Sequence, residues 1–291
     1  MDSSTITQTI IDTINTIFET LFGSIDNRLY TILDDLTFIA PDIIHDKNFE
    51  SILGTSTSNG ILLIANSFLL GFLLYYSFRH LLAYFTSIPI EKSYTFLIKL
   101  ILCGICMNFS YFLIEEYLSL HSNLTIAIQD LGKNLFHHQI CFSELITIIH
   151  TNISIEQNSL NIFSLDGLIQ GILSFSLLNL VFSYSLRYIM IKVFVLLTPF
   201  AILSASLSSF SWFFKAWLRN LFSLLFIQII VVFVLLILFS MDYSSSNLFV
   251  KFIYLGGIYA LIRSNQIVKE FIGGLSTSIS QSVDYFSQFK K

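Results

Sequence analysis

One short stretch of the sequence gathers the side-chain types that bind zinc. It holds His137, His138, Cys141 and Glu144. On a helix, either histidine would share a face with the cysteine and the glutamate, at spacings suited to metal ligands. The stretch lacks the HExxH and paired CxxC signatures of zinc sites. We therefore interpret it as a solvated polar face and expect neither a metal site nor a cofactor.

The other reactive residues do not indicate catalysis. Cys103 and Cys106 have the CxxC spacing of redox motifs, but they lie in an apolar run, where a thiol behaves as a small hydrophobic group. The chain has no GxxxxGK[ST], GxGxxG or GxSxG motif, so no ATPase, dinucleotide enzyme or serine hydrolase is indicated. We expect no catalytic residue and no enzyme activity.

Two basic residues, Arg187 and Lys192, interrupt another long apolar run. At a membrane-helix centre each costs on the order of 2.5 to 3.5 kcal/mol, so such residues face a bundle interior or watery cavity, pair with a carboxylate, or reach toward the surface. Five residues apart, they point about 140° apart around a helix. Thr198 and Pro199 follow, and proline cannot donate the helical hydrogen bond, so we expect a kink or break. These four residues predict a packed bundle with a polar seam, because the freed carbonyls need partners.

An aromatic and basic cluster follows this run. Its main members are Trp212, Lys215, Trp217 and Arg219. Tryptophan and basic side chains concentrate where a membrane helix meets the cytoplasmic interface. We interpret the cluster as a cytoplasmic anchor, or as a contact for substrate or partners.

The composition is that of an all-α, polytopic helical membrane protein. Hydrophobic residues make up 54% of the chain and charged residues 12%, and the mean hydropathy is +0.75. Thirty Phe and thirteen Tyr against three Pro favour helices with aromatic belts over a barrel. The first long apolar run begins only near Ile61, so we expect no cleavable signal peptide.

The chain divides into five predicted segments. They are an external amphipathic leader and linker (1–57), the first two transmembrane helices (58–118), an external acidic loop (119–165), a kinked long helix with the closing transmembrane helices (166–263), and a cytoplasmic amphipathic tail (264–291). Apolar residues recur every three or four positions near both termini, which predicts amphipathic helices there. We expect the leader to pack against a partner or another copy, or to fold back on its own bundle. The loop should form a short amphipathic hairpin over about 126–149.

The placement of basic residues decides whether 166–210 crosses the membrane once or turns back near Arg187. With one crossing, most basic residues collect on one side, as the positive-inside rule requires of the cytoplasm. They are Arg79, Lys92, Lys99, Lys215, Arg219, Arg263, Lys269, Lys290 and Lys291. A hairpin would place six of them outside. We expect about five net crossings of the cytoplasmic (inner) membrane, with the amino terminus outside and the carboxyl terminus in the cytoplasm.

The order of these parts resembles the TrbL-like polytopic subunit of type IV secretion and conjugation machines. The most specific part runs from Lys192 through the sequence LLTPFA to the turn FFKAWLRN, which ends at Asn220. The leader and loop are small for the family, and no large soluble tail follows Lys291. The resemblance implies a non-enzymatic channel or scaffold subunit that assembles with itself, with the transfer ATPase and with bitopic membrane subunits. Single-stranded DNA with its relaxase, or a protein effector, is the implied substrate.

Two other classes of function remain open from the sequence. In a small-molecule transporter, Arg187 and the Thr198–Pro199 break would form an anion site at the bilayer midplane. Such a transporter should show internal pseudo-symmetry, and we find none in the sequence. The second class is a stand-alone pore-forming or immunity-type membrane protein.

Overall fold

The computed structural model describes residues 9, 13, 27–54, 60–86, 92–153, 165–241 and 248–273. Within these ranges the regular structure is helical, which confirms the expected all-α class. The elements are α2 (Asn27–Thr37), the 3-10 turn η1 (Pro41–Ile43), α3 (Lys47–Leu53), α4 (Ile61–Thr86), α5 (Ser93–Asn108), α6 (Ser110–Phe136), α7 (Phe142–Ile153), α8 (Leu165–Ser204), α9 (Ser211–Phe239) and α10 (Leu248–Ile272).

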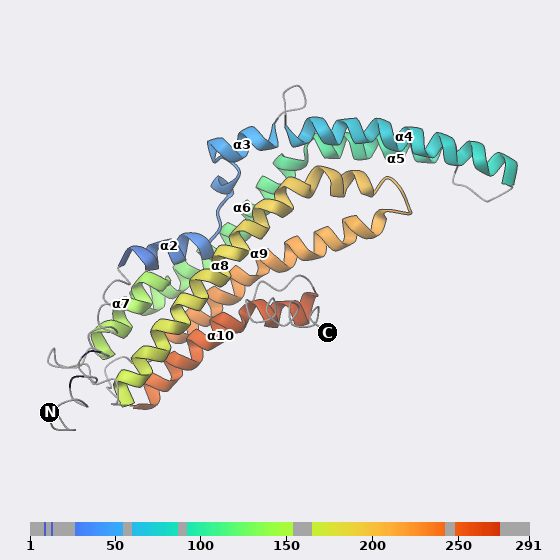
Figure 1. The fold of residues 1–291 in the computed structure, drawn as a ribbon. Coiled ribbons are helices and arrows are strands. Elements are labelled where there is room, and N and C mark those ends of the chain that lie inside the picture. Colours follow the sequence, from blue (N-terminus) through green and yellow to red (C-terminus); the bar gives the residue numbers. More distant parts are fainter. Residues whose placement is uncertain are drawn as a thin grey trace, which may run out of the picture.

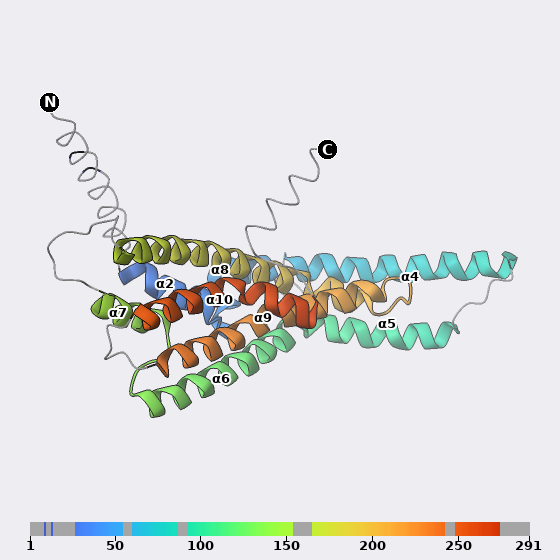
Figure 2. The same ribbon diagram turned by 90° about the horizontal axis from the view of Figure 1, so that it is seen from below.

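The molecule is an elongated bundle with two projecting helices. Helices α6, α8, α9 and α10 lie alongside one another, and α2 and α7 cover one end of this bundle (Figure 1). Helices α4 and α5 extend beyond the other end, where they run side by side and Tyr76 stacks on Phe96 (Figures 1 and 2). The turn between α8 and α9 lies against α4, where Phe210 stacks on Phe72 and Ser209 accepts a hydrogen bond from Arg79.

Three of the described helices are long and apolar enough to cross a membrane, namely α4, α8 and α9. The bent pair α5 and α6 adds a fourth candidate if it is counted as one span. The protein is therefore a helical membrane protein with several candidate spans. The fifth crossing expected in 248–263 is not in this group, and the count of five stays a prediction.

Helix α9 forms the centre of the bundle. In the apolar window of α9, 61% of the residues are buried inside the protein, against 17% for α4. Buried positions such as Leu221, Ser223 and Ile229 occur on different sides of α9, because α6, α8 and α10 all pack against it. Helix α4 instead turns most of its apolar surface outward, as expected of a helix that faces lipid.

The predicted second span, 94–118, is broken in the structure. Helix α5 ends at Asn108, α6 begins at Ser110, and the two axes differ by 61°. The Asn108 amide donates to the carbonyl of Gly104 and also pairs with the Asn66 amide of α4. The Asn108 side chain therefore forms its own hydrogen bonds where α5 ends, as asparagine often does at a helix terminus. Counting apolar residues along the sequence does not reveal these bonds.

The predicted external loop is mostly helix. Residues 119–136 belong to α6, since Leu118, His121 and Thr125 continue a buried stripe spaced by three and four. His137 ends α6 in a left-handed conformation, with φ 60°. Helix α7 then turns back, so the hairpin expected over 126–149 forms, although its first arm is part of the bundle.

The ends of the chain also differ from the expectation in detail. The predicted linker includes α3, which Asp46 caps and which buries Phe49 and Leu53 one turn apart. Helix α2 packs on α7 and α8 of its own bundle, which is one of the two alternatives for the leader. At the other end, α10 continues through 263 to Ile272. The remaining parts of the leader and tail stripes lie outside the described residues.

Helix α8 is continuous from Leu165 to Ser204, with no turn at Arg187. The hairpin alternative for 166–210 is therefore not formed. The chain reverses only at 205–210, after which α9 runs back along α8 (Figure 1).

Candidate functional site

Arg187 lies at the centre of the candidate site and is 0% exposed. Its Nε donates to the carbonyl oxygen of Leu224 at 2.8 Å, and its Nη1 donates to the carbonyl oxygen of Thr37 at 2.9 Å. Its Nη2 donates to Oε1 of Gln228 at 3.4 Å. Each nitrogen of the guanidinium therefore reaches an oxygen on α2 or α9.

Neutral oxygens balance the charge of Arg187. Among the described residues, no carboxylate lies within ion-pair distance of it. Thr37 is the last residue of α2, so its carbonyl carries part of the negative end of that helix dipole. Hydrogen bonds from a charged donor are stronger than those between neutral groups. Here they stabilise the guanidinium in the protein interior.

The hydrogen-bond network continues from Arg187 into α6. The Gln228 amide donates to Oγ1 of Thr125 at 3.1 Å, and Thr125 donates to the carbonyl of His121. The His121 ring packs edge-on against Tyr117 and Phe222. We call the chain Arg187, Gln228, Thr125 and His121 the polar seam. It joins α8, α9 and α6 in the core.

A second set of buried polar contacts joins α8 to α10. The Tyr184 hydroxyl lies 3.3 Å from the carbonyl oxygen of Leu261 and 3.4 Å from Oγ of Ser264. The adjacent residues also pair, since Asn265 donates to Oγ of Ser183 at 2.7 Å. Tyr184 also lies beside the Arg187 guanidinium, so polar contacts run across the bundle from α6 to α10.

Lys192 pairs with a carboxylate, one of the alternatives open from the sequence. Its Nζ lies 3.1 Å from Oδ2 of Asp46, and it packs near the rings of Phe49 and Tyr188. Asp46 is also the amino-terminal cap of α3. Arg187 and Lys192 therefore lie on different faces of α8, as their spacing predicts, and do not form one site.

The segment around Pro199 is stabilised by the aromatic cluster. Thr198 Oγ1 and Trp217 Nε1 both donate to the carbonyl oxygen of Phe194, at 3.1 and 2.9 Å. Proline at 199 removes the backbone donor to the carbonyl of Val195, which is the next residue after Phe194. The Trp217 bond therefore ties α9 to α8 beside the proline but does not itself satisfy the freed carbonyl. Trp217 is 5% exposed and belongs to the core rather than to an interfacial anchor.

The other members of that cluster lie on the surface. Trp212 is 64% exposed, and Lys215 and Arg219 are exposed. A methyl group built on Gly273 would lie 3.6 Å from Arg219 Cδ, so the arginine lies beside the carboxyl end of α10. A cation there interacts favourably with the helix dipole, which gives Arg219 a structural role besides any contact with partners.

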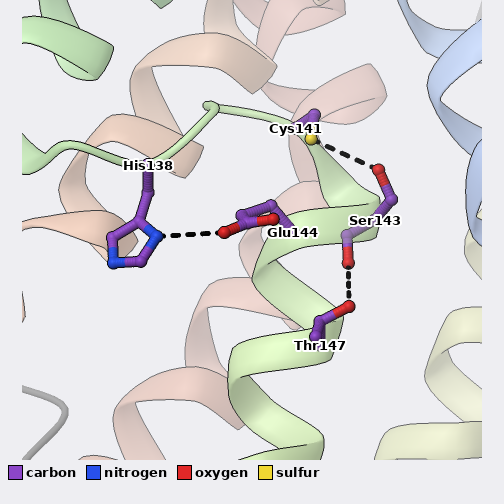
Figure 3. A network of polar contacts seen from close by, with 5 residues as sticks. All are labelled: His138, Cys141, Ser143, Glu144 and Thr147. Atoms are coloured by element: carbon purple, nitrogen blue, oxygen red, sulfur yellow. Dashed lines mark hydrogen bonds and ion pairs between the residues drawn. The ribbon is translucent and has the colours of Figure 1, made fainter.

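The four residues with zinc-binding side chains do not come together. Residues 137–141 form the turn between α6 and α7, so the shared helical face expected for His137, His138, Cys141 and Glu144 is wrong. His138 Nδ1 lies 3.0 Å from Glu144 Oε1, whereas Cys141 contacts Ser143 (Figure 3). No group of three metal-binding side chains occurs among the described residues.

Asp34 of α2 caps the start of α7. Its carboxylate accepts hydrogen bonds from the backbone amides of Phe142 and Ser143 and from the Ser143 hydroxyl, at 2.7, 3.1 and 2.6 Å. Burial raises the pKa of Asp34 above its ordinary value, and these three bonds only partly oppose the shift. Helix α2 thus makes two polar contacts. Its Asp34 side chain caps α7, and its Thr37 carbonyl accepts a hydrogen bond from Arg187 of α8.

Sequence reasoning found Arg187 but missed its partners. Gln228 is an amide within the long apolar run of α9, and that exception was the available signal. Thr37 contributes only its backbone carbonyl, so its side-chain type gives no indication of the contact. Thr125 and His121 were assigned to an external loop.

The fold and the polar seam define a multi-helix membrane protein with a buried cation, each of whose three nitrogens donates a hydrogen bond. Comparison of the chain with protein-family models, curated proteins and solved structures gives no match. Its function is therefore inferred from its own residues and their geometry.

Proposed function

We propose that this protein is a channel or scaffold component of a type IV secretion (conjugation) machine that helps to move a DNA–protein substrate across the cytoplasmic membrane. The proposal starts from the resemblance to TrbL-like subunits over Lys192–Asn220. In the structure this stretch is the last third of α8, the turn at 205–210 and the start of α9. Its proline and its aromatic cluster are in contact through Trp217.

The observation that carries the proposal is the distribution of basic side chains. The amino ends of α5 and α9 and the carboxyl ends of α4, α8 and α10 point to the same end of the molecule, which we call the basic end (Figures 1 and 2). Its basic residues are Arg79, Lys92, Lys99, Lys215, Arg219, Arg263 and Lys269. Lys133 and Lys251 lie toward the opposite end. This segregation supports a cytoplasmic basic end, where a phosphate backbone would enter.

A single copy does not provide a polar passage through the seam. Arg187, Tyr184 and Gln228 are each 0% exposed, and protein oxygens occupy all three guanidinium nitrogens. We therefore propose that several copies, together with the transfer ATPase and bitopic subunits, line the route of single-stranded DNA or its relaxase. The enclosed Arg187 also does not favour the anion site of a transporter.

The proposed topology has five crossings, an external amino terminus and a cytoplasmic carboxyl terminus. This topology places Arg187 and Lys192 in or near the membrane, where a basic side chain without partners is energetically costly. Hydrogen bonds to Thr37 and Leu224 support the first residue, and the ion pair with Asp46 supports the second. The contacts are thus compatible with a single crossing by α8.

A charge-reversal experiment tests the role of the basic end. The gene would be deleted in its own host and complemented with wild type, with Lys215→Glu/Arg219→Glu, or with Lys133→Glu as a matched reversal at the opposite end. We expect the double variant to lower DNA transfer at least about tenfold at equal protein level, because phosphate contacts dominate binding to DNA. Lys133→Glu should transfer normally.

The experiment has two informative failures. Normal transfer by the double variant would eliminate the proposed contact with DNA or partners at the basic end. Normal transfer by the deletion strain would eliminate the secretion function itself. Immunoblots of the membrane fraction would confirm that every variant accumulates to the same level.

A further inference from the structure

A crevice of about 420 Å³ lies between the α5–α6 bend and the α8–α9 hairpin. Its walls are apolar apart from the Tyr117 and Thr198 hydroxyls and the thiols of Cys103 and Cys106. The volume falls in the range of small-molecule pockets, roughly 300 to 1,000 Å³. No residue of the polar seam lines it.

The rim of this crevice is exposed, whereas its floor is buried. Leu102, Leu113 and Leu218 on the rim are 62%, 48% and 46% exposed. On the floor, Thr198 and Leu221 are 1% and 0% exposed. The crevice therefore opens sideways, through leucines that belong to candidate membrane-spanning segments.

The surroundings of the opening determine what can fill it. A lateral apolar opening in a membrane-spanning segment meets lipid tails rather than water. An empty crevice would forfeit the dispersion contacts of its lining, and water would find few hydrogen-bonding partners on these walls. A lipid acyl chain satisfies both conditions.

Two lysines give the opening a positive charge. Lys99 is exposed and continues the lining face of α5, three and four residues before Leu102 and Cys103. Lys215 is exposed on α9 and precedes the rim residue Leu218 by three positions. Both lie toward the amino ends of their helices, which point to the basic end (Figures 1 and 2). A phosphate at that level would be attracted to both lysines.

We propose that this crevice binds one acyl chain of an anionic phospholipid, with the headgroup phosphate beside Lys99 and Lys215. The chain would reach Thr198 and Trp217, the two residues that support the helix next to Pro199. Lipid composition would therefore act on the segment of α8 around Pro199. The proposal does not depend on the secretion function.

The chain has two tryptophans, which makes a selective test possible. Trp212→Phe leaves only Trp217 as the fluorescent reporter in the crevice, and Trp217→Phe leaves only the exposed Trp212 as the matched control. Each full-length variant would be reconstituted in phosphatidylcholine vesicles that contain brominated-acyl phosphatidylglycerol or, separately, brominated-acyl phosphatidylcholine. Bromine quenches tryptophan only at close range.

We expect phosphatidylglycerol to quench Trp217 at mole fractions at least about threefold lower than phosphatidylcholine, and Trp212 to show no such preference. Adding Lys99→Gln and Lys215→Gln to the Trp217 reporter should remove the preference, and these surface changes leave the core intact. Cys106→Phe, which fills the crevice, should abolish quenching of Trp217.

Two results would overturn the proposal. Absence of Trp217 quenching by both lipids, with Trp212 still quenched, would mean that protein side chains fill the crevice. Equal quenching of Trp217 by the two lipids would mean that the lysines select no anionic headgroup.

Discussion

Arg187 and Lys192 are two basic residues on one helix that the fold accommodates by different means. Arg187 is buried and bonds to neutral oxygens, whereas the Lys192 side chain is 22% exposed and faces a carboxylate that is 47% exposed. An exposed ion pair contributes little because water screens it and two long side chains lose entropy. A buried acceptor that loses its donor stays without a hydrogen bond, because water does not reach it.

This contrast predicts unequal effects of two matched substitutions. Arg187→Met removes the buried charge but leaves the Thr37 carbonyl and the Gln228 amide oxygen without their donors, at a loss of about 1 to 3 kcal/mol. Lys192→Met should cost less than about 1 kcal/mol. Thermal unfolding of the purified proteins in one detergent would compare them. Equal losses would contradict the assigned role of Arg187.

Asp34 predicts a pH dependence of stability. Because burial raises its pKa above the ordinary 3.8, the folded protein binds this proton at higher pH than the unfolded chain. Its contribution to stability therefore rises as the pH falls through the folded pKa toward 3.8. The Tm of wild type relative to that of Asp34→Asn should therefore rise as the pH falls toward 3.8.

Asp46 provides the control with the opposite sign. Its hydrogen bond with Lys192 lowers its pKa, so its stabilising contribution is complete above 3.8 and is lost only at lower pH. The difference in Tm between wild type and Asp46→Asn should stay constant over the range in which the Asp34 difference grows. A parallel response of the two variants would disprove the assignment.

At the scale of elements, close packing of α10 on α9 depends on one glycine of an adjacent pair. A methyl group on Gly257 would lie 2.4 to 3.0 Å from three carbon atoms of the Leu238 side chain. The same methyl group on Gly256 would meet nothing within 4 Å. Only Gly257 is therefore required for the contact between the two helices.

We predict that Gly257→Ala lowers the free energy of unfolding by about 1 to 3 kcal/mol, because the whole isobutyl group of Leu238 must move. Gly256→Ala should be neutral or stabilising by up to about 1 kcal/mol, as alanine favours helix. Denaturation of the two variants in the same detergent would measure the difference. A larger loss at Gly256 would contradict this packing.

Composition and periodicity were sufficient to predict helices, because long apolar runs leave few alternatives. Pro199 predicted a break, yet the helix continues to Ser204 with support from Thr198 and Trp217, which come from different helices. The actual break, at Phe109, carries no proline or glycine signal. Beside it Asn108 bonds to Asn66, 42 residues away, and such contacts are not visible in a single sequence.

The site shows the same limit. A basic residue in an apolar run predicts that partners exist, but does not identify them. Arg187 bonds to a backbone carbonyl 150 residues away, which any residue type could supply. Lys192 bonds to Asp46. The residues after Asp46 were predicted to be a linker, because a helix of seven residues is too short to show a clear apolar periodicity in the sequence.

At the scale of the whole molecule, α8 is longer than a membrane is thick. Its 40 residues extend about 60 Å, twice the hydrocarbon core. Helix α2 packs against α8, and α7 packs in turn on α2 (Figure 1). In the five-crossing topology, the amino-terminal part of α8 lies toward the outer surface and the turn at 205–210 lies in the cytoplasm.

Cysteine labelling in intact cells tests this orientation. In a background without the three native cysteines, Ser209→Cys should react with an impermeant maleimide only after permeabilisation, because the proposed topology places the end of α8 on the cytoplasmic side. Lys133→Cys, at the opposite end, should react in intact cells. External labelling of residue 209 would reverse the assigned topology.

The contacts of α8 with the leader also constrain the order of synthesis. One of the three acceptors of Arg187, the Thr37 carbonyl, and the acceptor of Lys192, Asp46, lie in residues made 150 and 146 positions earlier. At about 5 to 20 residues per second, the leader must remain available for roughly 8 to 30 seconds before α8 leaves the ribosome. Until then both cations lack their native partners, so membrane insertion of α8 and docking of the leader must be completed together.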